Sequence, residues 1–221
     1  MTQASLSAHA NSMDRMYRYT RHVYDVTRKP YLLGRDRLLE QMTILPGDKV
    51  LEIGTGTARN LIRLAEAHPS NALYGLDASS LMLQTAQERI ERSGLSGRIT
   101  LRQCMAEALD YRQTFGLSTP PEVIFFSYSL SMIPTWQQAL DCAITNLAPG
   151  RSIYIVDFWD QGDLPRPFAA ALKSWLNRFG VVHRPELLTH MQKLHAQGRA
   201  RLALASHFRR YAYIACLTPL P

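Results

Sequence analysis

The stretch from Val50 to Asn60, which reads VLEIGTGTARN, places a carboxylate and two glycines at alternate positions. Glu52 precedes Gly54 and Gly56, and glycines at such a turn let the backbone approach a ligand closely. A dinucleotide-binding turn wants Gly or Ala at its third position, where this chain has Arg59, and a Gly-Lys-Ser/Thr phosphate loop is absent. Because a carboxylate is poorly placed beside a pyrophosphate, the stretch favours a cationic cofactor.

S-adenosylmethionine fits that description, since its methionine end carries an ammonium and a sulfonium group. A second carboxylate, Asp77, follows the glycines by about twenty residues, where it can accept both ribose hydroxyls. The alternative is that Asp77 caps the helical run from Leu81. Cys104 and its successors are expected to border the adenine. The predicted cofactor contacts are Arg28, Glu52, Gly54, Thr55, Gly56, Asp77, Ala78, Met82, Met105, Ala106, Glu107 and Ser127.

Alternating apolar and helical patterns from residue 49 onward predict the elements that position these residues. Such alternation indicates an α/β protein with a parallel, doubly wound sheet, and two β-like runs in the tail suit an antiparallel edge. The expected strands are Lys49 to Ile53, Ala72 to Leu76, Ile99 to Arg102, Val123 to Phe126, Ser152 to Val156, Arg201 to Ala205 and Tyr211 to Leu217. The expected helices are Asn60 to Ala67, Ser80 to Arg92, Thr135 to Leu147, Phe168 to Phe179 and Glu186 to Ala196.

A helical lead precedes the sheet, from Asp14 to Arg28 and, after a break near Pro30, from Leu32 to Met42. Aromatic and cationic residues recur along it at alternating spacings of four and three, which places them on one helical face. That face either packs on the domain, with the arginines reaching solvent, or forms a lid over the site. Its residues are Tyr17, Arg21, Tyr24, Arg28, Tyr31 and Arg35.

The 221 residues, with 46% hydrophobic and 19% charged side chains, suit one globular domain with appendages. We expect a helical lead over residues 1–45 and a single domain over residues 46–221. Three widely spaced cysteines fit neither a disulfide framework nor a zinc site, and the histidines lack metal-ligand spacing, so no metal is expected. Because neither a signal peptide nor a membrane span is visible, a cytoplasmic protein is predicted.

The net charge of +7 is unevenly distributed. Residues Asp14 to Arg37 hold seven Lys or Arg against three acids, and Arg166 to Arg210 hold nine against one. Leu38 to Pro165 hold nine against fourteen. Two basic segments around an acidic middle suit an anionic partner, either a nucleic acid or an anionic lipid surface. The alternative is that both segments are solvated helix faces.

Nucleic acid is disfavoured as the partner by the sequence after the fourth strand. Methylation of an amino group on a base uses an Asx-Pro-Pro-aromatic turn there, whereas this chain reads FFSYSLSMIPTW. Cys104 and Cys142 fall in a strand region and a helix, so neither suits a nucleophile for pyrimidine methylation. No RNA-binding module is recognisable. We therefore expect no nucleic-acid partner.

From Lys49 to about Asp157 the chain resembles the class I S-adenosylmethionine-dependent methyltransferases. The resemblance implies a Rossmann-like, seven-stranded sheet with the tail supplying the final antiparallel hairpin. The family usually has Gly-Asp-Ala where this chain has Cys104, Met105 and Ala106. A carboxylate that is often aimed at the adenine amine is therefore missing.

Further strings resemble the methyltransferase components of betaine-lipid synthases. They are MYRYTRHVYDVTRKPYLLGRDRLL (Met16 to Leu39), SYSLSMIPTW (Ser127 to Trp136), IVDFWDQGDLP (Ile155 to Pro165) and RRYAYIACL (Arg209 to Leu217). The resemblance implies three successive N-methylations of diacylglycerylhomoserine at the inner membrane surface. A partner enzyme that transfers a 3-amino-3-carboxypropyl group would build the head group.

Methyl transfer to an amine needs little acid–base help. A reference α-amino group has a pKa of about 7.7 to 8.0, so a usable fraction is neutral, and tyrosine rings suit the cation that accumulates. The candidate catalytic residues are Tyr24, Tyr31, Tyr128 and, near the amine, Asp157. Phosphatidylethanolamine or a small soluble amine is the alternative acceptor, and a non-catalytic cofactor-binding subunit of a lipid-synthesis complex is the alternative from another class.

Overall fold

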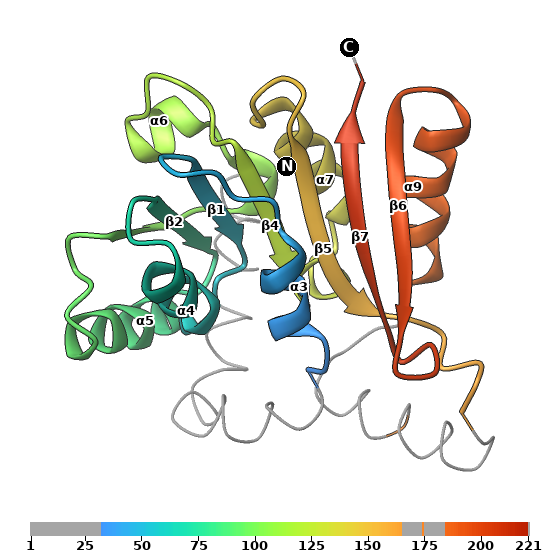
Figure 1. Cartoon of the computed structure of the whole chain (residues 1–221), viewed down its shortest axis with the longest axis horizontal. Coiled ribbons are helices and arrows are strands. Elements are labelled where there is room, and N and C mark those ends of the chain that lie inside the picture. Colours follow the sequence, from blue (N-terminus) through green and yellow to red (C-terminus); the bar gives the residue numbers. More distant parts are fainter. Residues whose placement is uncertain (1–31, 165–173, 175–183, 221) are drawn as a thin grey trace.

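One mixed sheet of seven strands organises the computed structural model, which describes residues 32–164, 174 and 184–220. The strand order is β3-β2-β1-β4-β5-β7-β6 (Figure 1). The first five strands pair in parallel, and β7 is antiparallel to both β5 and β6. The predicted doubly wound sheet is confirmed. The strands are β1 (Lys49–Ile53), β2 (Ala72–Asp77), β3 (Ile99–Gln103), β4 (Val123–Ser127), β5 (Ser152–Phe158), β6 (Ala200–His207) and β7 (Ala212–Pro219).

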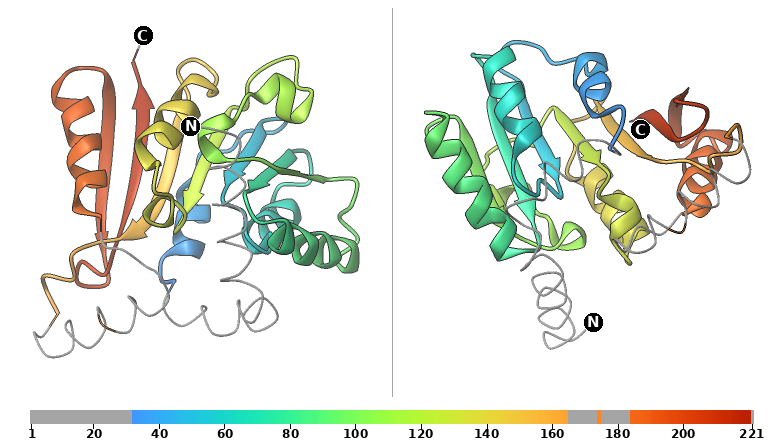
Figure 2. Two further views of the ribbon diagram at one scale, coloured as in Figure 1. Left: turned by 180° about the vertical axis from the view of Figure 1, so that it is seen from behind. Right: turned by 90° about the horizontal axis from the view of Figure 1, so that it is seen from below.

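Helices cover both faces of the sheet (Figure 2). One face carries α3 (Arg35–Gln41), α4 (Arg59–Ala67) and α5 (Ser80–Arg92), and the other carries α6 (Tyr111–Phe115), α7 (Trp136–Thr145) and α9 (Pro185–Ala196). A strand buried on both faces has apolar residues pointing each way. In β1, Val50 packs toward α4, whereas Leu51 and Ile53 join the core under α7.

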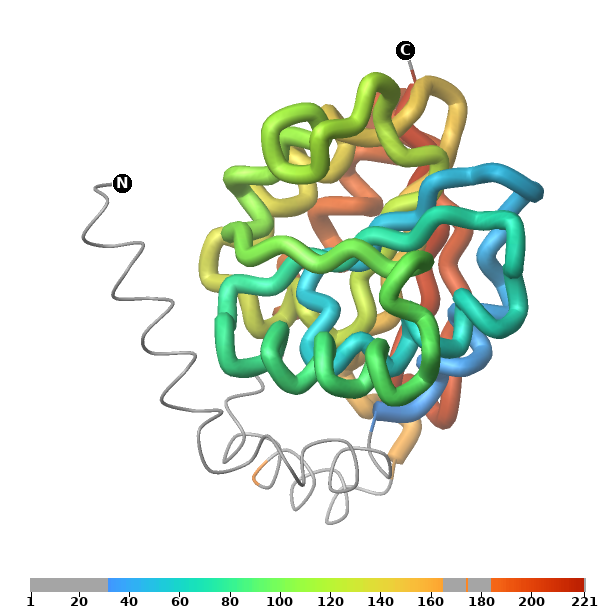
Figure 3. The backbone as a smooth tube through the Cα atoms, turned by 90° about the vertical axis from the view of Figure 1, so that its left-hand side faces the viewer, coloured from blue at the N-terminus to red at the C-terminus, as the bar shows by residue number. Residues whose placement is uncertain are grey.

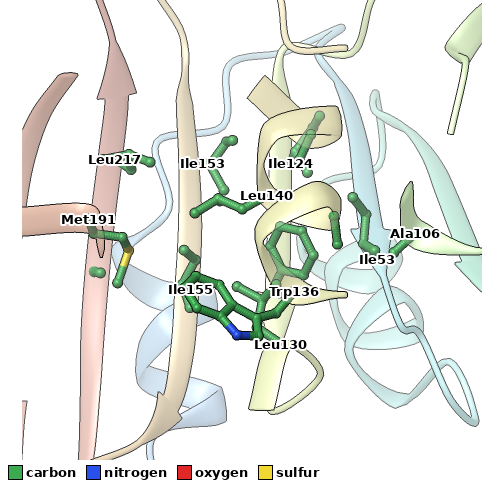
Figure 4. Packing of buried hydrophobic residues seen from close by; sticks show 14 of the residues in the cluster. Ile53, Ala106, Ile124, Leu130, Trp136, Leu140, Ile153, Ile155, Met191 and Leu217 are labelled. Carbon is green, nitrogen blue, oxygen red and sulfur yellow. The ribbon is translucent and has the colours of Figure 1, made fainter. Parts of the chain in front are cut away.

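The core under α7 is shown in Figure 4. Trp136 and Leu140 of α7 and Met191 of α9 meet Ile124 and Ile155 of the sheet, and all five side chains are at most 7% exposed. Two short 3₁₀ turns, η1 (Ala106–Ala108) and η2 (Leu130–Met132), contribute buried residues to the same core. They follow β3 and β4, so this packing holds the segments that leave the carboxyl edge.

Several element bounds differ from the sequence-based prediction. The helix expected from Leu32 begins at Arg35, because Gly34 lies in the left-handed region at φ 88°. The short helix α6 was not predicted, although Asp110 caps its start by accepting from Arg112 N and Gln113 N. The expected helices Asp14 to Arg28 and, apart from residue 174, Phe168 to Phe179 lie outside the described residues.

The start of α3 lies beside the turn between β6 and β7 (Figures 1 and 3). A Cβ atom built on Gly34 would lie 3.9 Å from the ring of Phe208 in that turn, and Arg37 and His207 share a hydrogen bond of 3.1 Å. Leu38 is fully buried against the sheet. The described end of the lead is thus attached to the carboxyl edge of the sheet.

Candidate active site

A cavity opens at the carboxyl ends of β1, β2 and β4, where the strand order reverses. Ligands of doubly wound sheets bind at this kind of point. Three of the predicted residues, Arg28, Tyr24 and Tyr31, lie outside the described part of the chain. Twelve of the predicted residues line the cavity: Glu52, Gly54, Thr55, Gly56, Asp77, Ala78, Met82, Met105, Ala106, Glu107, Ser127 and Tyr128.

The glycine turn after β1 is held against the end of β2. Gly54 N and Thr55 N both donate to Leu76 O, at 2.9 and 3.0 Å. Gly54 has φ +78°, and a Cβ atom on it would lie 2.5 Å from Ser129 Cβ in the segment after β4. Only glycine satisfies both constraints, so this residue sets how closely the two loops approach at the floor of the cavity.

Asp77, at the end of β2, is 8% exposed and binds the glycine turn. Its Oδ2 accepts from Gly56 N at 2.8 Å, and its Oδ1 accepts from Ser79 N at 2.9 Å. The helix cap that was the alternative role for Asp77 is supplied by Ser79, whose Oγ accepts from Met82 N. The carboxylate lines the cavity, so ribose binding by Asp77 stays a prediction that this geometry permits.

Glu52 lines the cavity and is 1% exposed. Its Oε2 accepts from Thr55 Oγ1 at 2.9 Å, and its Oε1 accepts from Asn60 Nδ2 at 2.7 Å. Burial raises the pKa of this carboxyl group to about 8, against the lowering effect of the two hydrogen bonds. A cation bound beside this carboxyl group would favour its charged form and lower its pKa.

This raised pKa makes a prediction about stability. Glu52 binds its proton more tightly in the folded chain than in the unfolded one, so its stabilising effect is complete below pH 4.5 and is lost as the pH rises through about 8. We expect the ligand-free protein to lose a few kcal/mol of unfolding free energy between pH 5 and pH 8.5. Denaturant unfolding at several pH values measures this.

Glu52→Gln is expected to reduce the loss of unfolding free energy that occurs above pH 6. Asp157→Asn provides a matched control, because burial raises the pKa of Asp157 only to about 6 and its contribution is lost at lower pH. An unchanged slope between pH 6 and pH 8.5 in Glu52→Gln contradicts the assignment.

The predicted adenine end lies after β3, at Met105, Ala106 and Glu107. Glu107 Oε1 accepts from Thr135 Oγ1 at 2.9 Å, whereas Oε2 is buried and has no hydrogen-bond partner among the described residues. Ser127 Oγ is in the same condition. Buried polar atoms are nearly always paired, so two orphaned atoms on residues that line one cavity indicate a polar ligand. Adenosine, with an amine and ribose hydroxyls, has groups to satisfy them.

Tyr128 lines the cavity at the end of β4, and Leu32, Met132 and Ile133 also line the cavity. It is 6% exposed, adopts a left-handed backbone at φ 56°, and donates its hydroxyl to Leu33 O. A left-handed backbone at a bulky residue is costly and tends to occur at functional sites. The hydrogen bond from Tyr128 to Leu33 O connects the helical lead to the carboxyl end of β4.

Asp157 was predicted near the amine, and the structure corrects its position. It is 1% exposed and is absent from the cavity lining. Its Oδ2 accepts from Ser131 N and its Oδ1 from Phe158 N. The side chain of Asp157 lies on the face of β5 that is directed toward η2. It therefore holds the loop after β4, whose neighbouring residues line the cavity. The side chain does not reach the cavity itself.

Several cavity residues were not predicted as site residues. Arg35, Arg59 and Asn60 arrive from α3 and α4, and Ser129 from the loop after β4. Of these, only Arg35 had a signal in the sequence, as the last member of the tyrosine and arginine face. The others depend on how loops meet in three dimensions. Leu32, Thr57, Leu76, Met132 and Ile133 complete the lining, together with Cys104, which was expected to border the adenine.

Comparison with curated proteins finds quinone methyltransferases. Demethylmenaquinone methyltransferase of Geobacillus stearothermophilus is 33% identical over 92 residues, 41% of this chain and 36% of that protein. The enzyme of the same name from Anoxybacillus flavithermus is 27% identical over 154 residues, 69% of this chain and 58% of that protein. The chain thus spans between about a third and somewhat over half of the length of these two relatives.

A solved structure shows the fold of the chain, and a family model shows its family. The YcgJ protein of Bacillus subtilis superimposes with a TM-score of 0.64 at 14% identity, over 85% of this chain and 99% of that one, which shows the fold. The model of a methyltransferase domain matches residues 44–201. With the reversed strand order, the glycine turn and the two carboxylates in place, the chain belongs to the class I methyltransferases, which use S-adenosylmethionine.

Proposed function

We propose that this methyltransferase N-methylates a lipid amine, diacylglycerylhomoserine, and carries it to the trimethylated betaine lipid. The observation that supports an amine is the chemistry of the cavity wall. No histidine or lysine lines the cavity among the described residues, and its carboxylates, Glu52, Asp77 and Glu107, occupy the places predicted for the cofactor. An acceptor that is already nucleophilic near neutral pH needs no base from the protein.

The chain's own contribution is then to position the acceptor. Bound S-adenosylmethionine supplies the methyl group, and an in-line approach of the neutral amine supplies most of the rate. Tyr128 offers a ring at the cavity wall, where a nitrogen with growing cationic character gains about 0.5 to 2 kcal/mol from an aromatic face. Leu32 and Met132, which pack in the same hydrophobic cluster as Tyr128, add apolar surface to the cavity.

Lipid specificity is supported by the four strings that resemble betaine-lipid synthase. We propose further that a partner enzyme builds the homoserine head group from the same cofactor. A second candidate is C-methylation of demethylmenaquinone, which the names of the curated relatives favour. The two reactions need different groups on the protein, because the acceptor in C-methylation is the reduced quinol, whose ring carbon becomes nucleophilic when the neighbouring hydroxyl loses its proton.

An acceptor panel decides between these candidates. The purified protein is incubated with S-adenosylmethionine carrying a heavy methyl group and with vesicles that contain diacylglycerylhomoserine, phosphatidylethanolamine or demethylmenaquinone that has been reduced to its quinol. We expect label in the homoserine lipid. Label only in the quinol would favour the second candidate, and label mainly in phosphatidylethanolamine would move the amine assignment to a different head group.

A lipid acceptor requires contact with its membrane, and we propose that the β6–β7 turn makes it. In the part of the chain that the structure describes, no helix is long and apolar enough to span a bilayer. Phe208 in this turn is 49% exposed, and Arg209 beside it is exposed. Phe208, Arg209 and Arg210 all have positive φ, between 53° and 57°, so the turn holds this aromatic and cationic tip in a strained backbone.

We expect Phe208→Ser to weaken binding to anionic vesicles about tenfold, since burial of an aromatic side chain contributes roughly 1.5 to 3 kcal/mol. Raising the salt concentration should weaken binding of the parent protein, because each basic residue adds about 1 kcal/mol at low salt. Leu45→Ser is the matched control: Leu45 is 50% exposed but precedes β1, at the opposite edge of the sheet. Co-sedimentation measures both, and equal binding by the parent and Phe208→Ser contradicts the proposal.

A further inference from the structure

Ser131 lies in η2, the turn after β4, and its peptide groups are bound from two sides. Its N donates to Asp157 Oδ2 at 2.9 Å, and its O accepts from Arg184 Nε at 2.8 Å. Asp157 belongs to β5, whereas Arg184 immediately precedes α9. Hydrogen bonds in which one partner is charged are stronger than those between neutral groups. Two charged side chains from distant segments therefore fix one residue of this turn.

The residues on both sides of Ser131 line the cavity. They are Tyr128, Ser129, Met132 and Ile133. The first part of this segment is fixed to β1, because Ser129 Oγ donates to Ile53 O at 2.7 Å. Met132 and Ile133 come directly after Ser131, so their position at the cavity depends on how Ser131 is held.

Asp157 is faced by polar groups from η2, α9, β7 and β4. Among the described residues, Ser131 faces it from η2 and Arg184 from the start of α9. Tyr213 lies opposite it in the register of β7, and Tyr128 acts on it from the end of β4. Burial holds the pKa of both tyrosines well above the ordinary value of 10, whereas burial raises the pKa of Asp157 only to about 6. Of these groups, Asp157 is the one that changes its charge near pH 6.

We propose that Asp157 and Arg184 act together as positioning residues for methyl transfer: they hold Ser131 and thereby set the part of the cavity wall that contacts the acceptor. Neither of them is among the described residues that line the cavity. The contact with Ser131 N is strongest while Asp157 is ionised, because a charged acceptor makes a roughly twofold stronger hydrogen bond. That the acceptor lies against Met132 and Ile133 rests on the proposed function.

Nuclear magnetic resonance of the ligand-free full chain tests the proposal without an acceptor. The signals followed between pH 5 and pH 8 are the amide of Ser131 and labelled methyl groups of Met132 and Ile133. In the parent protein we expect all three to shift with one midpoint near pH 6, and Asp157→Asn should abolish this step. The proposal is overturned if the amide does not titrate, or if the amide titrates and both methyl signals stay in place.

Initial rates with vesicles of diacylglycerylhomoserine measure the effect on methyl transfer. We expect kcat/KM to fall about tenfold to a hundredfold in Asp157→Asn and in Arg184→Met, as for a small displacement of reacting groups, with the affinity for S-adenosylhomocysteine within about threefold of the parent. Arg184→Lys should recover part of the loss, because an ammonium also donates to Ser131 O. The double variant should lose no more than the more affected single variant, since both side chains act through one residue.

Two exposed residues provide matched controls. Lys193→Met removes a cation from α9, and Asp141→Asn removes a carboxylate from α7. Both variants should keep the kcat/KM of the parent, and thermal melting shows that every variant is folded during the assay. If the affinity for S-adenosylhomocysteine falls as much as kcat/KM in Asp157→Asn and Arg184→Met, these residues serve folding and not positioning, and the proposal is overturned.

The pH profile of the parent protein adds a test that needs no variant. An amine with a pKa of about 7.7 to 8.0 loses its neutral form below that range, so log kcat/KM declines there with a slope of one. Protonation of Asp157 should make the slope exceed one between pH 6 and pH 5 in the parent but not in Asp157→Asn. A slope of one throughout in the parent overturns the proposal. If no lipid is methylated at all, the proposed function fails, while the resonance experiment still decides the role of Asp157.

Discussion

Replacing Asp77 by alanine is expected to weaken the binding of S-adenosylhomocysteine by about tenfold to a hundredfold. A hydrogen bond to a charged group contributes about 1.5 to 3 kcal/mol, and 1.4 kcal/mol corresponds to a factor of ten. Asp77 lies at the mouth of the strand crevice, is 8% exposed, and binds Gly56 N and Ser79 N. Its loss removes the predicted ribose acceptor and one support of the glycine turn at the same time.

A ligand that lacks one ribose hydroxyl separates those two effects. The parent protein should bind the 2′-deoxy analogue of S-adenosylhomocysteine more weakly than S-adenosylhomocysteine itself, whereas Asp77→Ala should bind both with one affinity. Titration calorimetry gives all four dissociation constants. If Asp77→Ala discriminates between the two ligands as well as the parent does, Asp77 supports the turn and does not bind the ribose.

Gly54→Ala is expected to have the largest effect on stability. Alanine at φ +78° is strained by about 1 to 3 kcal/mol, and its Cβ atom would overlap Ser129 Cβ at 2.5 Å, which adds about 1 to 3 kcal/mol of overpacking. A loss of about 2 to 4 °C in Tm for each kcal/mol applies to a chain of this size. The glycine turn would also move away from the segment after β4, so cofactor binding should be lost with the stability.

Gly94→Ala is the control that measures the effect of backbone strain without overpacking. Gly94 has φ +69°, but nothing lies within 4 Å of a Cβ atom built on it. We therefore expect a loss of about 1 kcal/mol and unchanged affinity for S-adenosylhomocysteine. Equal melting temperatures for Gly54→Ala and Gly94→Ala would show that the contact with Ser129 does not constrain the turn.

The sheet could be predicted from the sequence because its strands are short, apolar and separated by helical patterns. The run Lys49–Ile53 has the same bounds in the structure as in the prediction, and so does the helix Ser80–Arg92. Both follow from local properties: apolar residues that point to both faces of a strand, and a Ser79 cap before a periodic helix. The bounds of α3 were less accurate, since Gly34 delays its first turn.

Residues on the glycine turn and at the end of β2 were predictable for the same reason. Glu52, Gly54 and Asp77 lie at or just after the ends of strands, and the ends of these strands can be predicted from the local sequence. Arg35 and Ser129 reach the cavity through packing between distant segments, and no local pattern encodes that distance. The position of Asp157 could not be predicted from strand order alone. A residue at a strand end reaches the cavity only if its side chain lies on the face of the sheet that borders the cavity. The side chain of Asp157 accepts a hydrogen bond from Ser131 N instead.

We propose that this single chain transfers methyl groups from S-adenosylmethionine to the amine of diacylglycerylhomoserine. The most direct measurement is a mass-resolved time course with the purified protein, S-adenosylmethionine and that lipid in vesicles, with no other protein and no added metal. We expect lipids with one, two and three added methyl groups, which appear in that order. The proposal is contradicted if the purified chain adds no methyl group to this lipid, or if a single methyl group is all that it ever adds.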